Sequence, residues 1–384
     1  MKRFLVFLLA LLLAGCGNRA EPGNAATAAT ETTAEAVTET GTEAVTQPVT
    51  EAPDPLQECL DRMTLEEKIG QMILARCPDG TALEAIEAHH LGGFVLFGRD
   101  FENQTPDTLR QTLRSYQAAS KIPMLLAVDE EGGTVTRVSS RPAFRPEPFP
   151  SPRSLYSQGG MPLVLSLESE KAYLLSSLGI NVNLAPVCDI ALDVNSFLYS
   201  RSLGEDPETT GQFVAQSLQR MAEYGVGGVM KHFPGYGENG DTHVDVITDT
   251  RSLSQLEGWD LKPFAAGIQT GLGAVLVSHN IVTALDDQNP ASLSPNVMAY
   301  LRENMGFSGV IITDDLAMGA LKSYTPAQTA VMAVKAGVSM LCSTEYEAQI
   351  TAICEAVSAG EISEETVNDA VYRILSWKHQ LGLM

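Results

Sequence analysis

Short apolar runs alternate with longer amphipathic stretches along most of the chain, from about residue 56 to its end. Such runs are typical of buried strands, and their alternation with helical stretches indicates a parallel sheet joined by crossover helices. The expected strands are 71–75, 93–97, 124–128, 181–184, 227–230, 274–277, 310–312 and 339–341.

Several of the intervening stretches begin with Pro or Ser, which favours the start of a helix. The expected helices include 106–120, 207–224, 254–270, 295–305 and 326–336. Eight strands in this arrangement predict an α/β fold of the (β/α)8 TIM-barrel type. An open nucleotide-binding sheet is disfavoured, because the sequence has no GxGxxG or GxxxxGK[ST] motif.

Polar residues follow several of the apolar runs directly or nearly so. In a TIM barrel the carboxyl ends of the strands form the face that carries the catalytic groups, so we expect these residues near the site. They are Asp129, Asp189, Lys231, His232, Ser278, His279, Asp314, Asp315 and Ser343.

The chain begins with a processing signal. Lys2 and Arg3 precede an apolar run, 4–13, that is about half the length needed to span a membrane. Small residues then lead to Cys16, and the segment resembles a bacterial lipoprotein signal. The resemblance implies a signal peptide of residues 1–15, lipid attachment to Cys16, and an extracytoplasmic protein anchored to the membrane. An ordinary secretory signal is the alternative.

Ala, Thr, Glu and Pro dominate the next segment, and residues 17–55 contain no aromatic side chain. Such a composition cannot bury enough apolar surface to offset the entropy lost on ordering. We expect residues 16–55 to be a disordered tether and residues 56–384 to be one catalytic domain. The formal charge of −22 and the lack of a basic patch argue against nucleic acid as a partner.

The segment KHFPGYGENGDTH, residues 231–243, offers acid/base chemistry. In an extended chain Asp241 and His243 lie on the same side, so the carboxylate can orient the imidazole and tune its pKa. The glycines before them indicate a mobile loop that could deliver His243 to a substrate. Lys231 and His232 could donate hydrogen bonds to hydroxyl groups.

A candidate nucleophile stands where an apolar run stops at Asp314 and Asp315. A carboxylate there can attack an electrophilic carbon and form a covalent ester. Adjacent side chains on a strand point opposite ways, so only one of the two is expected to face the barrel mouth. The alternative is an aspartate that caps a helix beginning at Leu316.

The acidic run 129–131 ends another expected strand and passes into two glycines, which allow close backbone approach to a ligand. Asp129 could accept hydrogen bonds from two sugar hydroxyls. Arg137 and Arg201 are candidate partners of carboxylates or substrate oxygens, with surface salt bridges as the alternative.

Together these segments resemble glycoside hydrolase family 3, and specifically its single-domain β-N-acetylhexosaminidases. The matching segments are VDEEGGTVTRV (128–138), NVNLAPVCDI (181–190), RSLGEDP (201–207), KHFPGYG (231–237), DTH (241–243) and ITDDLAM (312–318). The resemblance implies a TIM barrel and a retaining mechanism through a covalent glycosyl-enzyme, without a metal or other cofactor.

The resemblance also implies roles for individual residues. Asp314 is the implied nucleophile, and His243 is the implied general acid/base, oriented by Asp241. The residues implied to bind the N-acetylglucosamine ring are Asp129, Arg137, Arg201, Lys231 and His232. The family loop often reads FPGHG with a longer stretch before Asp-Ser-His, whereas this chain has Tyr236 and a slightly shorter loop.

Resemblance and anchoring together imply exo-release of N-acetylglucosamine from cell-wall glycans. A phosphorylase or a β-glucosidase of the same family is an alternative, and so is a sugar-binding lipoprotein, which would have no use for Asp314 and His243. A further alternative is a metal-dependent barrel hydrolase. Its ligands would be His232, Asp241, His243 and His279.

Overall fold

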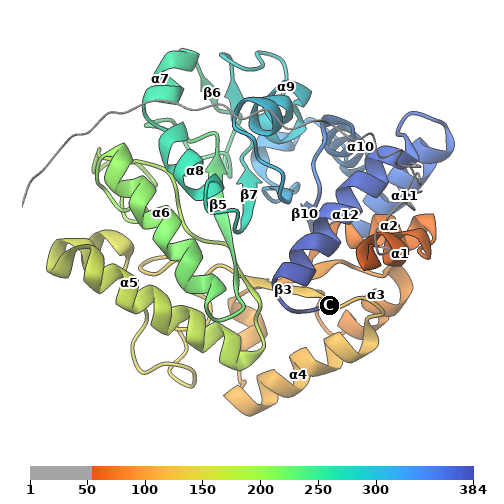
Figure 1. Cartoon of the computed structure of the whole chain (residues 1–384), viewed down its shortest axis with the longest axis horizontal. Helices are drawn as coiled ribbons and strands as arrows, with labels where there is room; N and C mark the ends of the chain where they lie inside the picture. Colours follow the sequence, from red (N-terminus) through yellow and green to blue (C-terminus); the bar gives the residue numbers. More distant parts are fainter. Residues whose placement is uncertain (1–53) are drawn as a thin grey trace, which may run out of the picture. The chain divides into compact units, whose positions relative to one another are not determined.

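The computed structural model describes residues 54–384, in which eight parallel strands form a barrel with helices around it (Figure 1). The strands are β1 (Ile73–Arg76), β2 (Gly93–Leu96), β3 (Leu125–Val128), β4 (Val182–Asn183), β5 (Gly227–Phe233), β7 (Ala274–Val277), β9 (Ile311–Thr313) and β10 (Leu341–Ser343). They are neighbours in that order, with β10 beside β1. A parallel bridge between Ile312 and Met340 joins β9 to β10, and the predicted (β/α)8 TIM barrel is confirmed.

Every expected strand overlaps an observed one, and most differ at their ends by one or two residues; the largest differences are at β5 and β10. Strand β5 continues past the predicted 227–230 and includes Lys231 and His232. Strand β10 begins at Leu341, where the predicted strand 339–341 ends. The hydrophobic pattern missed the end of β5 because its polar residues are buried and still pair with a neighbouring segment. The Lys231 carbonyl, for example, accepts a hydrogen bond of 2.6 Å from the amide of Cys188.

Helices follow most of the strands, and their buried faces join the strands in one core. Several begin with a Thr or Asp cap followed by Pro, as at Thr105 and Asp206. The α-helices are α1 (Pro55–Asp61), α2 (Leu65–Gln71), α3 (Ala82–His89), α4 (Pro106–Ala119), α5 (Pro152–Leu178), α6 (Pro207–Ala222), α7 (Leu253–Gly258), α8 (Leu261–Ile268), α9 (Pro295–Ala299), α10 (Pro326–Ala336), α11 (Tyr346–Ser358) and α12 (Glu364–Gln380).

Several stretches depart from the predicted helices. The predicted helix 295–305 is α9 followed by a π-helical turn, Tyr300–Asn304. The predicted helix 254–270 is two helices, α7 and α8, because the backbone of Trp259 is non-helical (φ −131°, ψ −79°). Helix α5 was not predicted, since Gly159, Gly160 and Pro162 interrupt its sequence. Gly160 is in fact non-helical, so α5 is kinked there. A separate small parallel sheet pairs β6 (Thr248–Asp249) with β8 (Ile281–Val282).

The expected signal peptide, Cys16 and nearly all of the expected tether lie outside the described residues. Among residues 54–384, no helix combines the length and the apolar character needed to cross a bilayer.

Candidate active site

The strand register places Asp314 on the inner side of the barrel. Ile312 is level with Met340, so Asp314 shares its side of the sheet with Cys342. Burial, followed by the carboxylates of Asp315, Asp314 and Asp129, raises the pKa of the Cys342 thiol, so this residue lies near the charged groups at the barrel mouth. Of the two adjacent carboxylates, Asp314 is therefore the one that the register directs inward.

The backbone around Asp314 fixes its carboxylate. Its amide donates to the carbonyl of Val277 at 2.9 Å, and its Oδ1 accepts from the amide of Asp315 at 2.9 Å. Burial alone would raise the pKa of the Asp314 carboxyl, but the imidazoles of His279 and His232 outweigh burial and hold that pKa below its ordinary value. Asp314 is therefore ionised and able to act as a nucleophile.

The helix-cap alternative for these aspartates is wrong. No helix begins at Leu316, and the next element is a single 3-10 turn, Gly319–Leu321, which Met318 precedes.

Asp241 and His243 form the pair that the sequence suggested. His243 Nδ1 lies 2.7 Å from Asp241 Oδ1, and the His243 amide donates to the same oxygen at 2.9 Å. The His243 side chain is 60% exposed, so its remaining ring nitrogen is accessible to a substrate. The carboxylate thus orients an imidazole whose far side is open to solvent.

The loop that carries this pair docks on the segment directly after Asp314. The amide of Ala320 donates to the carbonyl of Thr242 at 3.1 Å. A Cβ on Gly319 would lie 2.7 Å from the carbonyl oxygen of His243, so only glycine allows the loop to approach this closely. The two segments that carry the candidate nucleophile and the candidate acid/base are therefore in direct contact.

An ion-pair cluster holds the start of the same loop. Arg251 lies 2.6 Å from Asp249 and 2.5 Å from Asp260, and it also donates to the Gly235 carbonyl at 3.3 Å. Gly235 has φ +110°, and a Cβ there would lie 2.7 Å from Asp260. Burial raises the pKa of Asp260 to about 6, so the carboxylate that pairs with Arg251 is mostly ionised only above that pH.

Tyr236, the residue at which this chain departs from the family pattern, braces the loop from inside. It is buried, its hydroxyl lies 2.5 Å from the hydroxyl of Thr242, and its amide donates to Asp189 at 2.8 Å. Thr242 stands between Asp241 and His243, so Tyr236 links the acid/base pair to the barrel wall.

Tyr236→Phe is expected to reduce kcat/KM about tenfold on a substrate with a poor leaving group, and less on a 4-nitrophenyl glycoside. The variant loses only the hydroxyl that fixes Thr242, and proton donation matters most when the leaving group is weak. Steady-state kinetics on 4-methoxyphenyl and 4-nitrophenyl glycosides measures the difference. In a His243→Ala background the same change should add nothing. Additive losses would show that Tyr236 does not act through His243.

A second group of charged residues is buried where β3 and β5 end. Lys231 Nζ lies 2.7 Å from Asp129 Oδ1 and 2.6 Å from Glu131 Oε1. Arg201 meets Glu131 with two hydrogen bonds, of 2.9 and 2.7 Å. Burial alone would raise the pKa of Glu131, but Lys231 and Arg201 outweigh burial and hold it far below its ordinary value. Two of the predicted binding residues, Lys231 and Arg201, are thus joined through Glu131, and a third, Asp129, binds Lys231.

His232 extends this group. Its Nδ1 lies 2.7 Å from Asp189 Oδ2, and its Nε2 lies 3.1 Å from a terminal nitrogen of Arg201. Asp189 and Arg201 therefore fix the position of the His232 ring from its two nitrogens.

Sequence reasoning missed Glu131 as a member of the site, and it expected Asp189 near the site without assigning it a partner. Glu131 is one of three consecutive acidic residues, and nothing in the sequence distinguishes it from Glu130. The Glu130 carboxylate instead accepts from the amides of 137–139 and shapes the loop. Arg137 is not in the Lys231 cluster; its guanidinium lies 6.0 Å from the Phe97 ring.

The four proposed metal ligands do not converge. His232 is bound by Asp189 and Arg201, and His279 bonds to Ser292 at 2.7 Å and to the Asp315 carbonyl at 2.9 Å. No three residues of metal-binding type come together anywhere in the described part of the chain.

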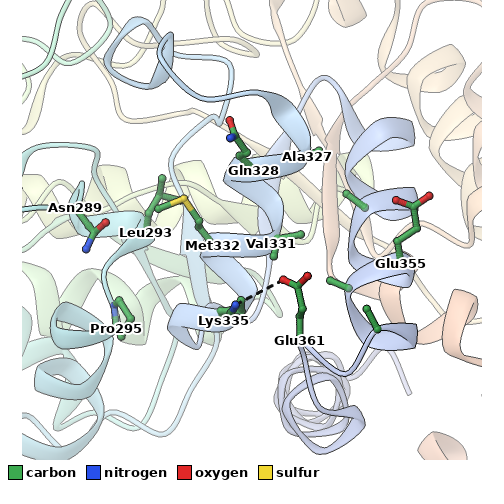
Figure 2. Close-up of a pocket in the computed structure, with 13 residues that line it drawn as sticks. Asn289, Leu293, Pro295, Ala327, Gln328, Val331, Met332, Lys335, Glu355 and Glu361 are labelled. Carbon is green, nitrogen blue, oxygen red and sulfur yellow. Dashed lines mark ion pairs between the residues drawn. The ribbon is translucent and has the colours of Figure 1, made fainter.

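Two grooves of the described domain lie elsewhere. One has a volume of about 670 Å³. Figure 2 shows its apolar side chains, such as Val331 and Met332, and the ion pair between Lys335 and Glu361, which are 3.8 Å apart. Another, of about 690 Å³, lies beside Gly309 and Trp377. Neither groove is lined by a residue of the candidate site, such as Asp314, His243 or Lys231.

A parallel eight-stranded barrel with acidic and imidazole groups at the carboxyl ends of its strands has the layout of a TIM-barrel enzyme. Residues 64–377 match the family model described as "Glycosyl hydrolase family 3 N terminal domain". The chain therefore belongs to glycoside hydrolase family 3 and is a glycosidase.

Individual relatives agree with this assignment. A protein of Nitrosomonas eutropha named "Beta-hexosaminidase" is 32% identical over 68% of this chain and 76% of its own length. A solved family 3 β-N-acetylglucosaminidase from Paenibacillus is 31% identical with a TM-score of 0.77, covering 84% of this chain and 63% of that one. A solved β-N-acetylhexosaminidase from Beutenbergia cavernae is 26% identical with a TM-score of 0.74, covering 83% and 99%.

Proposed function

We propose that this protein is a retaining exo-β-N-acetylglucosaminidase that acts through a covalent ester at Asp314. The observation that carries the proposal is the contact between the loop bearing Asp241 and His243 and the segment after Asp314. That contact supports a site in which the oriented imidazole of His243 and the ionised carboxylate of Asp314 act at the same end of the barrel. The names of the Nitrosomonas and Paenibacillus relatives support a hexosaminide as the substrate.

In the first step, Asp314 attacks the anomeric carbon as the glycosidic bond breaks. The departing oxygen takes the proton of the His243 imidazolium, which Asp241 stabilises. An ester now joins the sugar to Asp314, and His243 is neutral. Most glycosidases use a second carboxyl group for this proton transfer, and the His–Asp pair replaces it here.

In the second step, neutral His243 takes a proton from a water molecule, whose oxygen attacks the anomeric carbon. The bond to Asp314 breaks and its carboxylate is restored, so the sugar leaves with its original configuration. The buried group of Asp129, Lys231, Arg201 and His232 offers donors and acceptors for the hydroxyls of one terminal sugar. That arrangement supports exo-action.

We further propose that the chain is a lipoprotein, lipidated at Cys16 after removal of residues 1–15. A position outside the cytoplasm favours N-acetylglucosamine at the ends of peptidoglycan-derived fragments as the natural substrate. Mass spectrometry of the mature protein from its host membrane tests the anchor. A protein that is released without lipid would contradict this part of the proposal.

Phosphate in place of water is the second candidate acceptor. A neutral imidazole repels an anion less than a carboxylate does, and His243 is open to solvent. Time-resolved proton NMR of wild-type turnover, with and without phosphate, separates the possibilities. We expect free β-N-acetylglucosamine as the first product in both buffers. An α-anomer formed first would contradict retention, and the sugar 1-phosphate would identify a phosphorylase.

A further inference from the structure

Arg76 lies at the carboxyl end of the barrel, on the same side of the sheet as Asp314. It ends β1, where Leu74 is level with Cys342 and Arg76 is level with Val95. Residues level with each other in a parallel sheet point to the same side, and so do residues two apart on one strand. Arg76 therefore shares the inner side with Cys342 and, through it, with Asp314.

Phe97, just after β2, supports the Arg76 side chain. The Arg76 guanidinium lies 4.5 Å from the centre of the Phe97 ring, and Arg137 lies 6.0 Å from the same ring. Leu96 is level with Val128, so Phe97 is adjacent to Asp129, which is already part of the candidate site. Two guanidinium groups thus lie near one aromatic ring, beside the predicted sugar-binding residues.

Neither of these guanidinium groups forms an ion pair among the described residues. No carboxylate lies within ion-pair distance of Arg76 or Arg137, and the buried Nε of each has no hydrogen-bond partner. Asp100 and Asp315 are near enough to Arg76 for its charge to oppose the rise of their pKa, but neither carboxylate binds it. The chain carries a formal charge of −22, so two arginines without an ion pair beside one ring are unusual. By contrast, Lys231 and Arg201 both form ion pairs with carboxylates.

We propose that Arg76, supported by the Phe97 ring that Arg137 also approaches, forms a subsite for an oxyanion substituent on the substrate. A guanidinium binds a carboxylate or a sulfate or phosphate ester through two parallel hydrogen bonds, and stacking on an aromatic ring fixes its plane. The subsite makes the enzyme selective for acidic amino sugars over neutral ones. It deepens the proposed function and rests on it, because the anion must belong to the sugar that occupies the mouth.

The test is equilibrium binding, which does not depend on turnover. Isothermal titration calorimetry compares three probes: N-acetylglucosamine, its 6-sulfate, and N-acetylmuramic acid, which carries a carboxylate at O3. The sulfate and the carboxylate probe different positions on the ring. We expect one of the two acidic sugars to bind at least about tenfold more tightly than N-acetylglucosamine.

Arg76→Met keeps an unbranched apolar side chain but removes the charge, and it should abolish that advantage. Arg76→Lys should keep part of it. Arg62→Met is the matched control: it removes one positive charge from a side chain that is 71% exposed just after α1, and should leave the advantage intact. Circular dichroism spectra and melting temperatures of all variants establish that they fold.

The subsite is overturned if neither acidic sugar binds better than N-acetylglucosamine, or if the advantage survives in Arg76→Met. A failure of the proposed function looks different. In that case the wild type would not hydrolyse 4-nitrophenyl N-acetyl-β-glucosaminide, while the ratio of dissociation constants would still depend on Arg76.

Discussion

Asp314→Ala is expected to lower kcat on 4-nitrophenyl N-acetyl-β-glucosaminide by about 10⁴-fold or more, because no ester can form without this carboxylate. The 4-nitrophenolate leaving group needs little help from an acid, so a large loss of kcat on this substrate reports on the nucleophile rather than on proton transfer. Asp315→Asn is the matched control. The register does not direct Asp315 inward, so this change should cost less than about tenfold.

Azide distinguishes the nucleophile from the acid/base. In Asp314→Ala, azide can fill the space left by the carboxylate and attack the sugar directly, which gives the α-glycosyl azide. In His243→Ala, azide attacks the ester at Asp314 and gives the β-glycosyl azide. Identification of the two products by NMR therefore checks both roles. The same anomer from both variants, or equal loss in Asp314→Ala and Asp315→Asn, would refute the assignment of Asp314.

Glu131→Gln has the second largest expected effect, on stability as well as on activity. Glu131 is buried and forms ion pairs with both Lys231 and Arg201. Its amide replacement leaves these two cations with a single carboxylate, Asp129, and removing one partner of a buried ion pair costs about 3–5 kcal/mol. We also expect kcat/KM to fall by about 10²-fold or more, since Lys231 and Arg201 lose their positions.

Glu102→Gln provides the comparison for this prediction. Glu102 pairs with Arg141 at 2.9 Å, but its side chain is 56% exposed, so its loss should cost no more than about 1 kcal/mol. Urea unfolding monitored by fluorescence gives both free energies. If Glu131→Gln and Glu102→Gln were equally stable, the buried group would not be the structural centre of the site.

The barrel itself could be predicted because its signal is periodic and local. Each strand is a short apolar run, and each polar residue at its end lies at one face by the geometry of parallel sheets. What the pattern could not resolve was the polar end of β5, where Lys231 and His232 belong to the strand although they are not apolar. Their pairing with the Cys188 segment is a tertiary contact, and no local pattern encodes it.

In the candidate site, as in the barrel, the sequence predicted the local contacts and missed those between distant residues. Asp241 and His243 are two residues apart, and their hydrogen bond follows from local geometry. The choice between Asp314 and Asp315 required the register of β9 against β10. Glu131 and Asp189 required more, because each is defined by residues far away in the sequence, Arg201 and His232 respectively. The brace from Tyr236 to Thr242 likewise appears only once the loop is folded.

The most direct test of the central claim is to trap the ester. A 5-fluoro analogue of N-acetylglucosaminyl fluoride forms the glycosyl-enzyme and slows its hydrolysis, and trypsin then releases residues 303–322 as one peptide. We predict a mass increase of one fluorosugar on that peptide, assigned to Asp314 by fragmentation. A label on Asp315 or on any other peptide, or an active enzyme that never accumulates a label, would contradict a covalent intermediate at Asp314.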